Sequence, residues 1–230
     1  MQQPKILVGC PTSEHKAYCL PEYAEAIKSL TYPHYDILLV DNSATNDYSE
    51  KIKQFGLPVV KDIYLPRARQ RITHSRNILR EHVLEKGYDY FLCLEQDVIP
   101  PSNVIELLLA HQKSVVTGVY FTRYFDHGKP LFRPLLWEHS SVSPDTMRFV
   151  SEETLRQNQL ISAFACGLGC ILIHRSVLEK ISFHLFTDKK TYDDMPFCAD
   201  LRDHQIQLFA DTAVKCKHLI SGMKWEDIEE

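Results

Sequence analysis

Two carboxylates at the end of an apolar segment, Glu95 and Asp97, are the residues of this sequence best placed to do chemistry. They close the segment FLCLEQD (91–97), whose first four residues are apolar and predict a buried strand. Side chains two positions apart in a strand point to the same side, so both carboxylates would share one face. Such a face could hold a hard divalent cation and leave coordination positions open for substrate. The alternative is that both acids only favour the positive end of the helix that Pro100 starts.

Polar residues also follow two earlier apolar segments. Pro11 and Thr12 come after KILVGC (5–10), while Asp41 and Asn42 close the segment YDILLVDN. Open α/β sheets bind ligands beyond the carboxyl ends of their strands, so a nucleotide could reach all of these groups. Asp41 would then accept a hydrogen bond from a base or a ribose. A single aspartate after a strand is more often a turn former or a helix cap, which is the competing interpretation of Asp41.

The elements that would position these residues alternate along the first 121 residues. Continuous apolar character predicts buried strands over 5–10, 35–43, 57–63, 88–97 and 114–121. Helical spacing predicts helices over 20–30, 46–55, 73–87 and 100–110, with Thr73 as a cap and Gly87 as a stop. This β-α-β order predicts an α/β fold, a mostly parallel central sheet with helices on both faces.

The alternation ends after residue 121. Residues 122–158 are polar and aromatic without a clear period, which predicts loops and short strands. Residues 163–181 predict a strand, a turn and a helix, residues 192–205 a further helix, and residues 206–218 two short strands that end at His218. No repeat, low-complexity segment or linker interrupts the chain, so we expect one domain over residues 1–230.

Composition and charge exclude several classes of protein. The chain has 26 Lys and Arg against 30 Asp and Glu, a net charge of −4, which gives no electrostatic footprint for nucleic acid. No apolar run reaches the roughly 20 residues of a transmembrane segment, and the N-terminus does not resemble a signal peptide. Seven scattered cysteines, an odd number with four inside apolar segments, favour reduced thiols. The spacing of Cys166 and Cys170 is also a poor match to a zinc site. We expect a cytoplasmic protein, free or peripheral to a membrane; an extracellular domain is the alternative.

Five segments in order carry a resemblance to a known family: VGCPTSEH, LLVDNSATND, SRNILRE, DYFLCLEQDVIPP and TYDDMPFCADLRDHQIQLFADTAVKCKH. Together they resemble the GT-A glycosyltransferases, especially the large inverting, family 2-like nucleotide-sugar transferases, over about residues 4–218. The resemblance implies a Rossmann-like GT-A fold with a small mixed sheet in the C-terminal half. It also implies that residues 1–121 bind the nucleotide sugar and residues 122–230 supply the acceptor site and catalysis.

The resemblance implies roles for the acidic residues. Asp97 stands at the last acid of the Asp-x-Asp motif and would coordinate Mn²⁺ or Mg²⁺, with Glu95 in place of the first Asp and His218 as a further ligand. Asp194 stands at the catalytic base, and Asp193 replaces the Glu beside it. A hydroxyl acceptor needs such a base to take its proton. The alternatives are a surface histidine at a strand end for His218 and an acidic helix start for the Asp pair.

Further residues would contact the two substrates. Arg76 matches a family arginine whose helix faces the nucleotide, and Arg71 could bind the diphosphate, because guanidinium binds phosphate oxygens in pairs; a solvated basic face is the alternative. The expected nucleotide-sugar contacts are Pro11, Thr12, Asp41, Asn42, Arg71, Arg76 and Gln96. The expected acceptor contacts are Trp137 and Tyr124, since aromatic faces stack on sugars, and Gly167, whose segment resembles the small-residue segment near the acceptor in relatives. The aromatic residues could instead form a minor core under the loop.

These expectations combine into a metal-dependent glycosyltransferase. It would move a sugar from a nucleoside diphosphate sugar, a UDP-sugar first and GDP-mannose next, to a carbohydrate or other hydroxyl acceptor. With Asp194 as the base, inversion follows, although retaining relatives share the fold and the Asp-x-Asp motif. One alternative is a sugar-nucleotidyltransferase, whose glycine-rich, arginine-containing loop is missing from GCPTSEHK. The other is a non-catalytic module that binds a nucleotide on the same fold.

Overall fold

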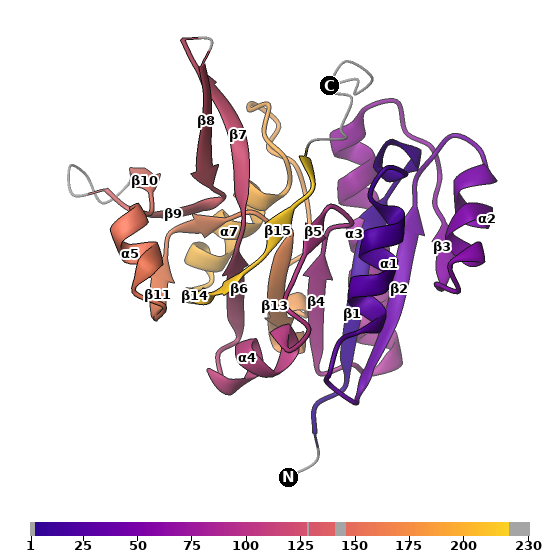
Figure 1. The fold of residues 1–230 in the computed structure, drawn as a ribbon, viewed down its shortest axis with the longest axis horizontal. Coiled ribbons are helices and arrows are strands. Elements are labelled where there is room, and N and C mark those ends of the chain that lie inside the picture. The colour runs from indigo at the N-terminus through magenta and orange to yellow at the C-terminus, as the bar shows by residue number, and fades with distance from the viewer. Residues whose placement is uncertain (1–2, 128, 141–145, 221–230) are drawn as a thin grey trace.

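A computed structural model describes residues 3–127, 129–140 and 146–220 of the chain. Its centre is an eight-stranded sheet (Figure 1). In spatial order the strands are β11 (Leu160–Ala163), β14 (Leu208–Lys215), β6 (Val115–Val119), β13 (Cys170–His174), β4 (Tyr90–Leu94), β1 (Ile6–Thr12), β2 (Tyr35–Asp41) and β3 (Val59–Lys61). Six of them run in one direction; β13 is antiparallel to β4 and β6, and β11 is antiparallel to β14. The predicted α/β fold with a mostly parallel sheet is confirmed.

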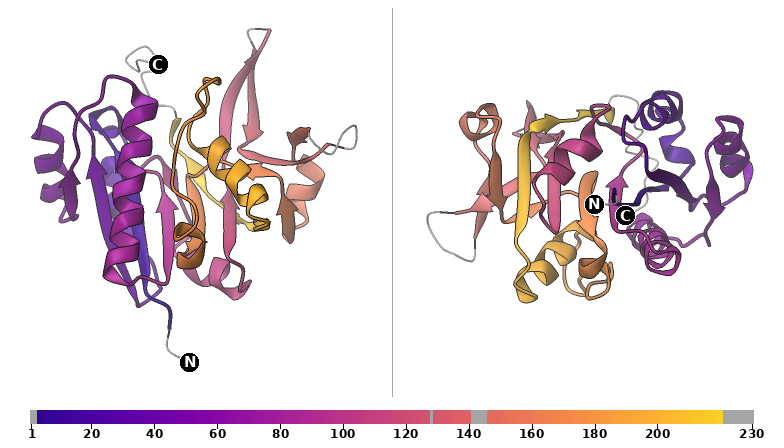
Figure 2. Two further views of the ribbon diagram at one scale, coloured as in Figure 1. Left: turned by 180° about the vertical axis from the view of Figure 1, so that it is seen from behind. Right: turned by 90° about the horizontal axis from the view of Figure 1, so that it is seen from below.

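Helices cover both faces of this sheet. Figure 1 shows α1 (Leu20–Lys28) and α4 (Val104–Ala110) in front of it, with α2 (Asp47–Gln54) near its β3 edge. From behind, Figure 2 shows α3 (Ala68–Lys86) and α7 (Asp194–Asp203) on the opposite face, where α6 (Arg175–Leu178) also packs against α3. Each face has its own buried apolar cluster. In α1 the residues Leu20, Tyr23, Ala24 and Ile27 are buried, the spacing of a single helical face.

Helix α3 differs from its prediction at one end. It begins at Ala68, after Arg67 in an extended conformation, and not at Thr73. The Thr73 hydroxyl donates to the Arg69 carbonyl, so this threonine lies within the helix and does not cap it. The predicted stop is confirmed, because Gly87 has a φ of 71° at the C-cap. The longer helix therefore includes Ile72, which the prediction left outside it.

The C-terminal half supplies short strands beside the sheet. A hairpin of β7 (Phe121–Asp126) and β8 (Lys129–Pro134) rises above the carboxyl ends of the parallel strands (Figure 1). Strands β10 (Met147–Phe149), β9 (Leu136–His139) and β12 (Ala165–Cys166) form a three-stranded sheet, with α5 (Glu152–Arg156) after β10. Finally, β15 (Lys217–His218) pairs with β5 (Val98–Ile99). None of the helices in the described part of the chain is long and apolar enough to cross a bilayer.

Candidate active site

The carboxyl ends of β1, β2 and β4 meet at a small cavity of about 60 Å³. The parallel register places Thr12 of β1 opposite Asp41 of β2, so the polar residues that follow these strands come together. Five predicted residues line the cavity, namely Pro11, Thr12, Asn42, Glu95 and Gln96. Three further lining residues, Ser13, Lys16 and Ile72, were not predicted. Ser13 and Lys16 come shortly after Thr12, where β1 ends. Their place after this strand is the sequence feature from which they could have been predicted.

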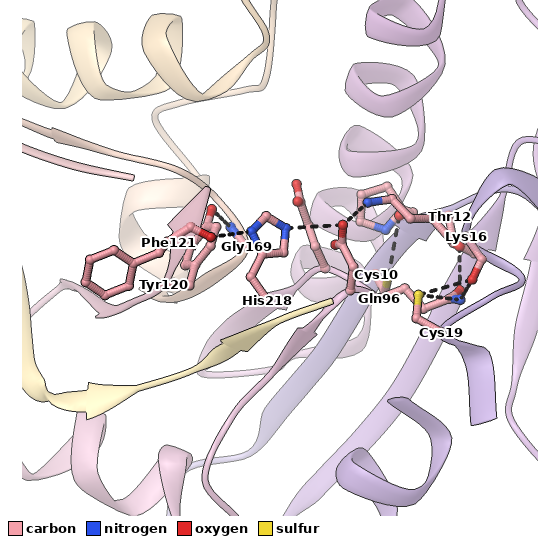
Figure 3. A network of polar contacts seen from close by, with 12 residues as sticks. Cys10, Thr12, Lys16, Cys19, Gln96, Tyr120, Phe121, Gly169 and His218 are labelled. Atoms are coloured by element: carbon pink, nitrogen blue, oxygen red, sulfur yellow. Dashed lines mark hydrogen bonds and ion pairs between the residues drawn. The ribbon is translucent and has the colours of Figure 1, made fainter. Parts of the chain in front are cut away.

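Asp97 lies at the centre of a polar network, and Figure 3 labels two of its partners, Lys16 and His218. Its carboxylate is only 1% exposed, and its Oδ2 accepts a hydrogen bond from Lys16 Nζ and lies 3.2 Å from His218 Nε2. Burial alone would favour the neutral acid, but Lys16 and His218 hold the pKa of Asp97 well below its usual range. The other oxygen, Oδ1, is buried without a hydrogen-bond partner. A buried, charged oxygen without a partner marks a place for a further positive group.

The β5–β15 pairing positions His218 beside this carboxylate, because it sets His218 opposite Val98. The ring lies 2.7 Å through Nδ1 from the Phe121 carbonyl and faces Asp97 through Nε2. Since both neighbours are acceptors, both ring nitrogens donate. Burial opposes the charged form, but Asp97 and the Phe121 carbonyl outweigh it and raise the pKa of His218. The edge of His218 also packs on Tyr120 at a centroid distance of 5.3 Å.

These residues fit a hard divalent cation. Asp97 offers its unpartnered Oδ1, and the Phe121 carbonyl would keep a proton on His218 Nδ1, which leaves Nε2 for a metal once its own proton is lost. The described ranges contain no cluster of three or more His, Cys, Asp or Glu side chains arranged to bind a metal without further ligands. A cation bound here would therefore depend on oxygens from a substrate or from water for its remaining ligands.

Arg76 joins both halves of the chain through Glu95 and Asp193. Its Nη2 donates to Glu95 Oε1 at 2.9 Å, and its Nη1 forms an ion pair with Asp193 Oδ1. The guanidinium also lies 5.6 Å from the ring centroid of Phe183. Arg76 is thus buried among protein groups and contacts two other predicted site residues. It does not line the cavity where a nucleotide contact was expected.

Asp194 begins α7, directly after this ion pair. Its Oδ1 accepts a hydrogen bond from the Met195 amide at 2.8 Å. Burial, and then the charge of Asp193, raise the pKa of Asp194 to about 6. Burial, and to a smaller extent the charge of Asp194, raise the pKa of Tyr120 and Tyr124. A carboxylate with this pKa can take a proton near neutral pH, which is the property of a general base.

Three predicted nucleotide contacts are engaged by other parts of the protein. Asp41 accepts from the Ser43 amide at 2.9 Å and from the hydroxyls of Ser43 and Ser49 at 2.6 Å, as in the turn-former interpretation. Arg71 donates to the carbonyls of Leu65 and Pro66 and stacks on Tyr64. Gln96 accepts from the hydroxyls of Thr12 and Tyr48 and donates to the Lys16 carbonyl. Asp41 and Arg71 thus stabilise turns, and Gln96 holds the segment after β1.

The predicted acceptor residues lie on the C-terminal half. Trp137 is 9% exposed and packs on Phe149 at 5.3 Å, so it has the minor-core role that was the alternative. Tyr124, on the hairpin, is 37% exposed, so part of its side chain is accessible to solvent. Gly167 and Gly169 lie against Tyr120, whose hydroxyl accepts a hydrogen bond from the Gly169 amide at 2.8 Å. A side chain at either glycine would meet the Tyr120 ring or hydroxyl, which explains the small residues of this segment.

Solved structures share this fold. GalNAc-T7, solved with UDP, GalNAc and Mn²⁺, aligns with 94% of this chain and 44% of its own at a TM-score of 0.65 and 12% identity. A mannosyltransferase from Pyrobaculum calidifontis, PcManGT, solved with GDP-Man and Mn²⁺, aligns with 99% of this chain and 59% of its own at a TM-score of 0.64 and 14% identity. A197 from STIV aligns with 95% of this chain and 87% of its own at a TM-score of 0.50 and 17% identity.

The chain spans about half the length of the first two proteins, and identities this low establish the fold alone. That fold is the GT-A fold of glycosyltransferases, as the sequence predicted. The sequence profile of glycosyl transferase family 2 matches residues 15–182, more than half of the chain. The protein therefore belongs to glycosyl transferase family 2. No curated protein matches its sequence.

Proposed function

We propose that the protein is a metal-dependent glycosyltransferase that moves a sugar from a nucleoside diphosphate sugar to a hydroxyl acceptor. The observation that carries this proposal is that two carboxylates of the candidate site, Asp97 and Asp194, have pKa values shifted in opposite directions. Asp97 is ionised and has an unpartnered buried oxygen, whereas the pKa of Asp194 is raised to about 6. The first property suits a cation and the second suits a base. Both GT-A structures above contain Mn²⁺, which supports the choice of metal.

Asp97 and His218 would hold the cation, Mn²⁺ or Mg²⁺, and Glu95, which lines the cavity, would act through water or through the donor. When bound, the cation would supply positive charge that stabilises the departing diphosphate. Asp194 takes the proton of the acceptor hydroxyl as the new bond to the anomeric carbon forms. The bond from that carbon to the diphosphate breaks in the same step, and the nucleoside diphosphate leaves with the electron pair. This single displacement inverts the anomeric carbon.

Residues 1–121 would bind the donor and residues 122–230 the acceptor, within one domain. Thr12 and Asn42 line the cavity at the strand ends and are the donor contacts with the most direct support. The donor is a UDP-sugar or GDP-mannose; the first two structures above contain UDP and GDP-Man, respectively. Tyr124 is the acceptor contact that its exposure supports best. We place the protein in the cytoplasm, as the sequence predicted.

The test is a thermal-shift panel of UDP, GDP, CDP, ADP and TDP, each with and without Mn²⁺. A ligand at about 100 times its Kd stabilises the folded state by about 2.7 kcal/mol, which raises Tm by several degrees. We expect a shift with one diphosphate that requires Mn²⁺ and disappears in Asp97→Asn. Asp203→Asn, an exposed position on α7, is the matched control and should shift like the wild type.

Turnover separates an enzyme from a binding module. Asp194→Asn should keep the diphosphate-induced shift but lose transfer of sugar from the donor that the panel identifies. If wild-type protein binds no diphosphate, the donor site is wrong. If it binds one but Asp194→Asn and the wild type both fail to transfer or hydrolyse any sugar of that nucleotide, a non-catalytic module replaces the proposal.

A further inference from the structure

Lys16 is a positively charged residue that lines the cavity at the carboxyl ends of the strands. It follows β1 at the end of the short helix η1 (Glu14–Lys16), and its Nζ contacts Asp97 Oδ2. The Asp97 carboxylate is 1% exposed, whereas the Lys16 side chain is 23% exposed. An ammonium group therefore contacts the carboxylate that would bind the divalent cation, and Lys16, labelled in Figure 3, also lines the cavity.

The backbone of Lys16 is held in place, but its side chain is not fixed by the same contacts. The Lys16 carbonyl accepts hydrogen bonds from Gln96 Nε2 at 2.6 Å and Cys19 Sγ at 3.1 Å, and the Lys16 amide donates to the Ser13 carbonyl. A lysine side chain rotates about four bonds, and its ammonium can donate in three directions. Nζ can therefore exchange partners while the chain around it stays where it is.

The cavity is small for its proposed ligand. Its volume is about 60 Å³, whereas pockets for small-molecule ligands span roughly 300–1,000 Å³. A nucleoside diphosphate sugar would therefore extend beyond the cavity, and movement of a lining side chain would add room for its diphosphate. Lys16 is the cationic side chain among the residues that line the cavity, so its displacement changes both the space and the charge there.

Electrostatics gives the direction of the movement. A divalent cation on Asp97 would lie close to the ammonium group of Lys16, because both would contact the same carboxylate. Two neighbouring positive charges repel strongly in a partly buried site. The diphosphate of a donor brings new negative charge into the same cavity. Lysine binds phosphate oxygens as a compact point charge, so the diphosphate is the favourable new partner for Nζ.

We propose that Lys16 exchanges Asp97 for the donor diphosphate when the divalent cation binds. Before the exchange, Lys16 neutralises Asp97 and keeps the empty cavity stable. After it, the cation holds Asp97 and the ammonium group adds a second positive contact to the diphosphate. Lys16 is then a donor-binding residue in competition with the metal. This inference rests on the proposed function, because it needs a cation and a nucleoside diphosphate in this cavity.

The exchange predicts effects of opposite sign in one variant. Lys16→Met removes the competitor of the metal and also a contact to the diphosphate. We expect Mn²⁺ to bind Lys16→Met about tenfold more tightly than wild type when no nucleotide is present, measured from free Mn²⁺ by electron paramagnetic resonance. At saturating Mn²⁺, UDP or GDP should bind about tenfold more weakly by calorimetry. Lys51→Met, an exposed position on α2, is the matched control and should change neither affinity.

Other outcomes overturn the inference. If Lys16→Met leaves both affinities unchanged, or weakens both, Lys16 does not exchange partners, and the proposed function stands as long as wild type binds Mn²⁺ and a diphosphate. If wild type binds neither, the proposed function fails and the inference fails with it. Should Lys16→Met not fold, Lys16→Gln, which keeps a hydrogen-bond donor without the charge, must reproduce both opposite effects.

Discussion

Arg76 and Asp193 form an ion pair in which both side chains are almost completely buried, 1% and 2% exposed, and it joins the two halves of the chain. Arg76 lies on α3, within the expected nucleotide-binding half, and Asp193 precedes α7 in the other half. The same guanidinium donates to Glu95 at the end of β4. One side chain thus contacts both Glu95, which lines the cavity, and the start of the helix that carries Asp194. The pair positions both parts of the proposed active site relative to each other.

Replacement of Arg76 should be strongly destabilising. Arg76→Met leaves Asp193 buried without its partner, a change that costs about 3–5 kcal/mol in other buried ion pairs. Urea unfolding monitored by circular dichroism measures the loss. The control is Arg156→Met, whose exposed pair with Glu152 should contribute less than about 1 kcal/mol. Equal losses of unfolding free energy in both variants would show that the buried pair contributes no more to stability than the exposed one.

The pKa of Asp194 predicts how activity depends on pH. A base must be deprotonated, so transfer should rise with pH through about 6 and then level off. The measurement is kcat/KM between pH 5 and pH 8 at saturating Mn²⁺. A profile that is flat across this range would exclude Asp194 as the base.

The same pKa predicts an opposite trend in stability. The folded-state pKa is raised from 3.8 to about 6, so ionised Asp194 opposes folding. Both states are protonated below about pH 4, the cost grows between pH 4 and 6, and it reaches at most about 3 kcal/mol above pH 6. Asp194→Asn should therefore be more stable than wild type at pH 7.5 and equal to it at pH 3.5. A stability difference that does not vary with pH would contradict the assigned pKa.

Tyr120 explains the glycines beside it, and two double variants test this. A methyl group at Gly167 would meet chiefly the Tyr120 hydroxyl, whereas one at Gly169 would also lie 2.6 Å from Tyr120 Cζ and 2.9 Å from Val98 Cγ2. Each Gly→Ala change should cost about 1–3 kcal/mol. Tyr120→Phe should rescue much of the loss in Gly167→Ala and little of that in Gly169→Ala. Equal rescue by thermal unfolding would contradict this packing.

Tyr124 and Trp137 should separate acceptor binding from stability. Tyr124→Ala is expected to raise the KM of the acceptor with a stability change below about 1 kcal/mol, because Tyr124 keeps an exposed face. Trp137→Ala should cost about 3–5 kcal/mol, because Trp137 is buried against Phe149. Steady-state kinetics and urea unfolding of both variants provide the comparison. The reverse pattern would assign the sugar platform to Trp137.

The periodicity of the chain is enough to predict the fold and the edge of the sheet where the site lies. Runs such as 5–10 and 35–43 become buried parallel strands because their apolar character is local and continuous. Parallel strands bring their carboxyl ends together, so Thr12, Asn42 and Glu95 meet without any further information. The order of the family segments adds the GT-A fold, which the sequence profile and the solved structures bear out.

Tertiary packing alone determines which polar groups are used by the protein itself. Asp41 and Arg71 look available in the sequence, yet neighbouring hydroxyls and carbonyls engage them. Lys16 belongs to no motif that predicts a role for it. The turn after β1 nevertheless places it in contact with Asp97, which lies 81 positions later in the sequence. Such contacts depend on how helices and turns lie over the sheet, which no local pattern encodes. The sequence by itself therefore determined the family and the site's location, and the folded chain determined its charges and partners.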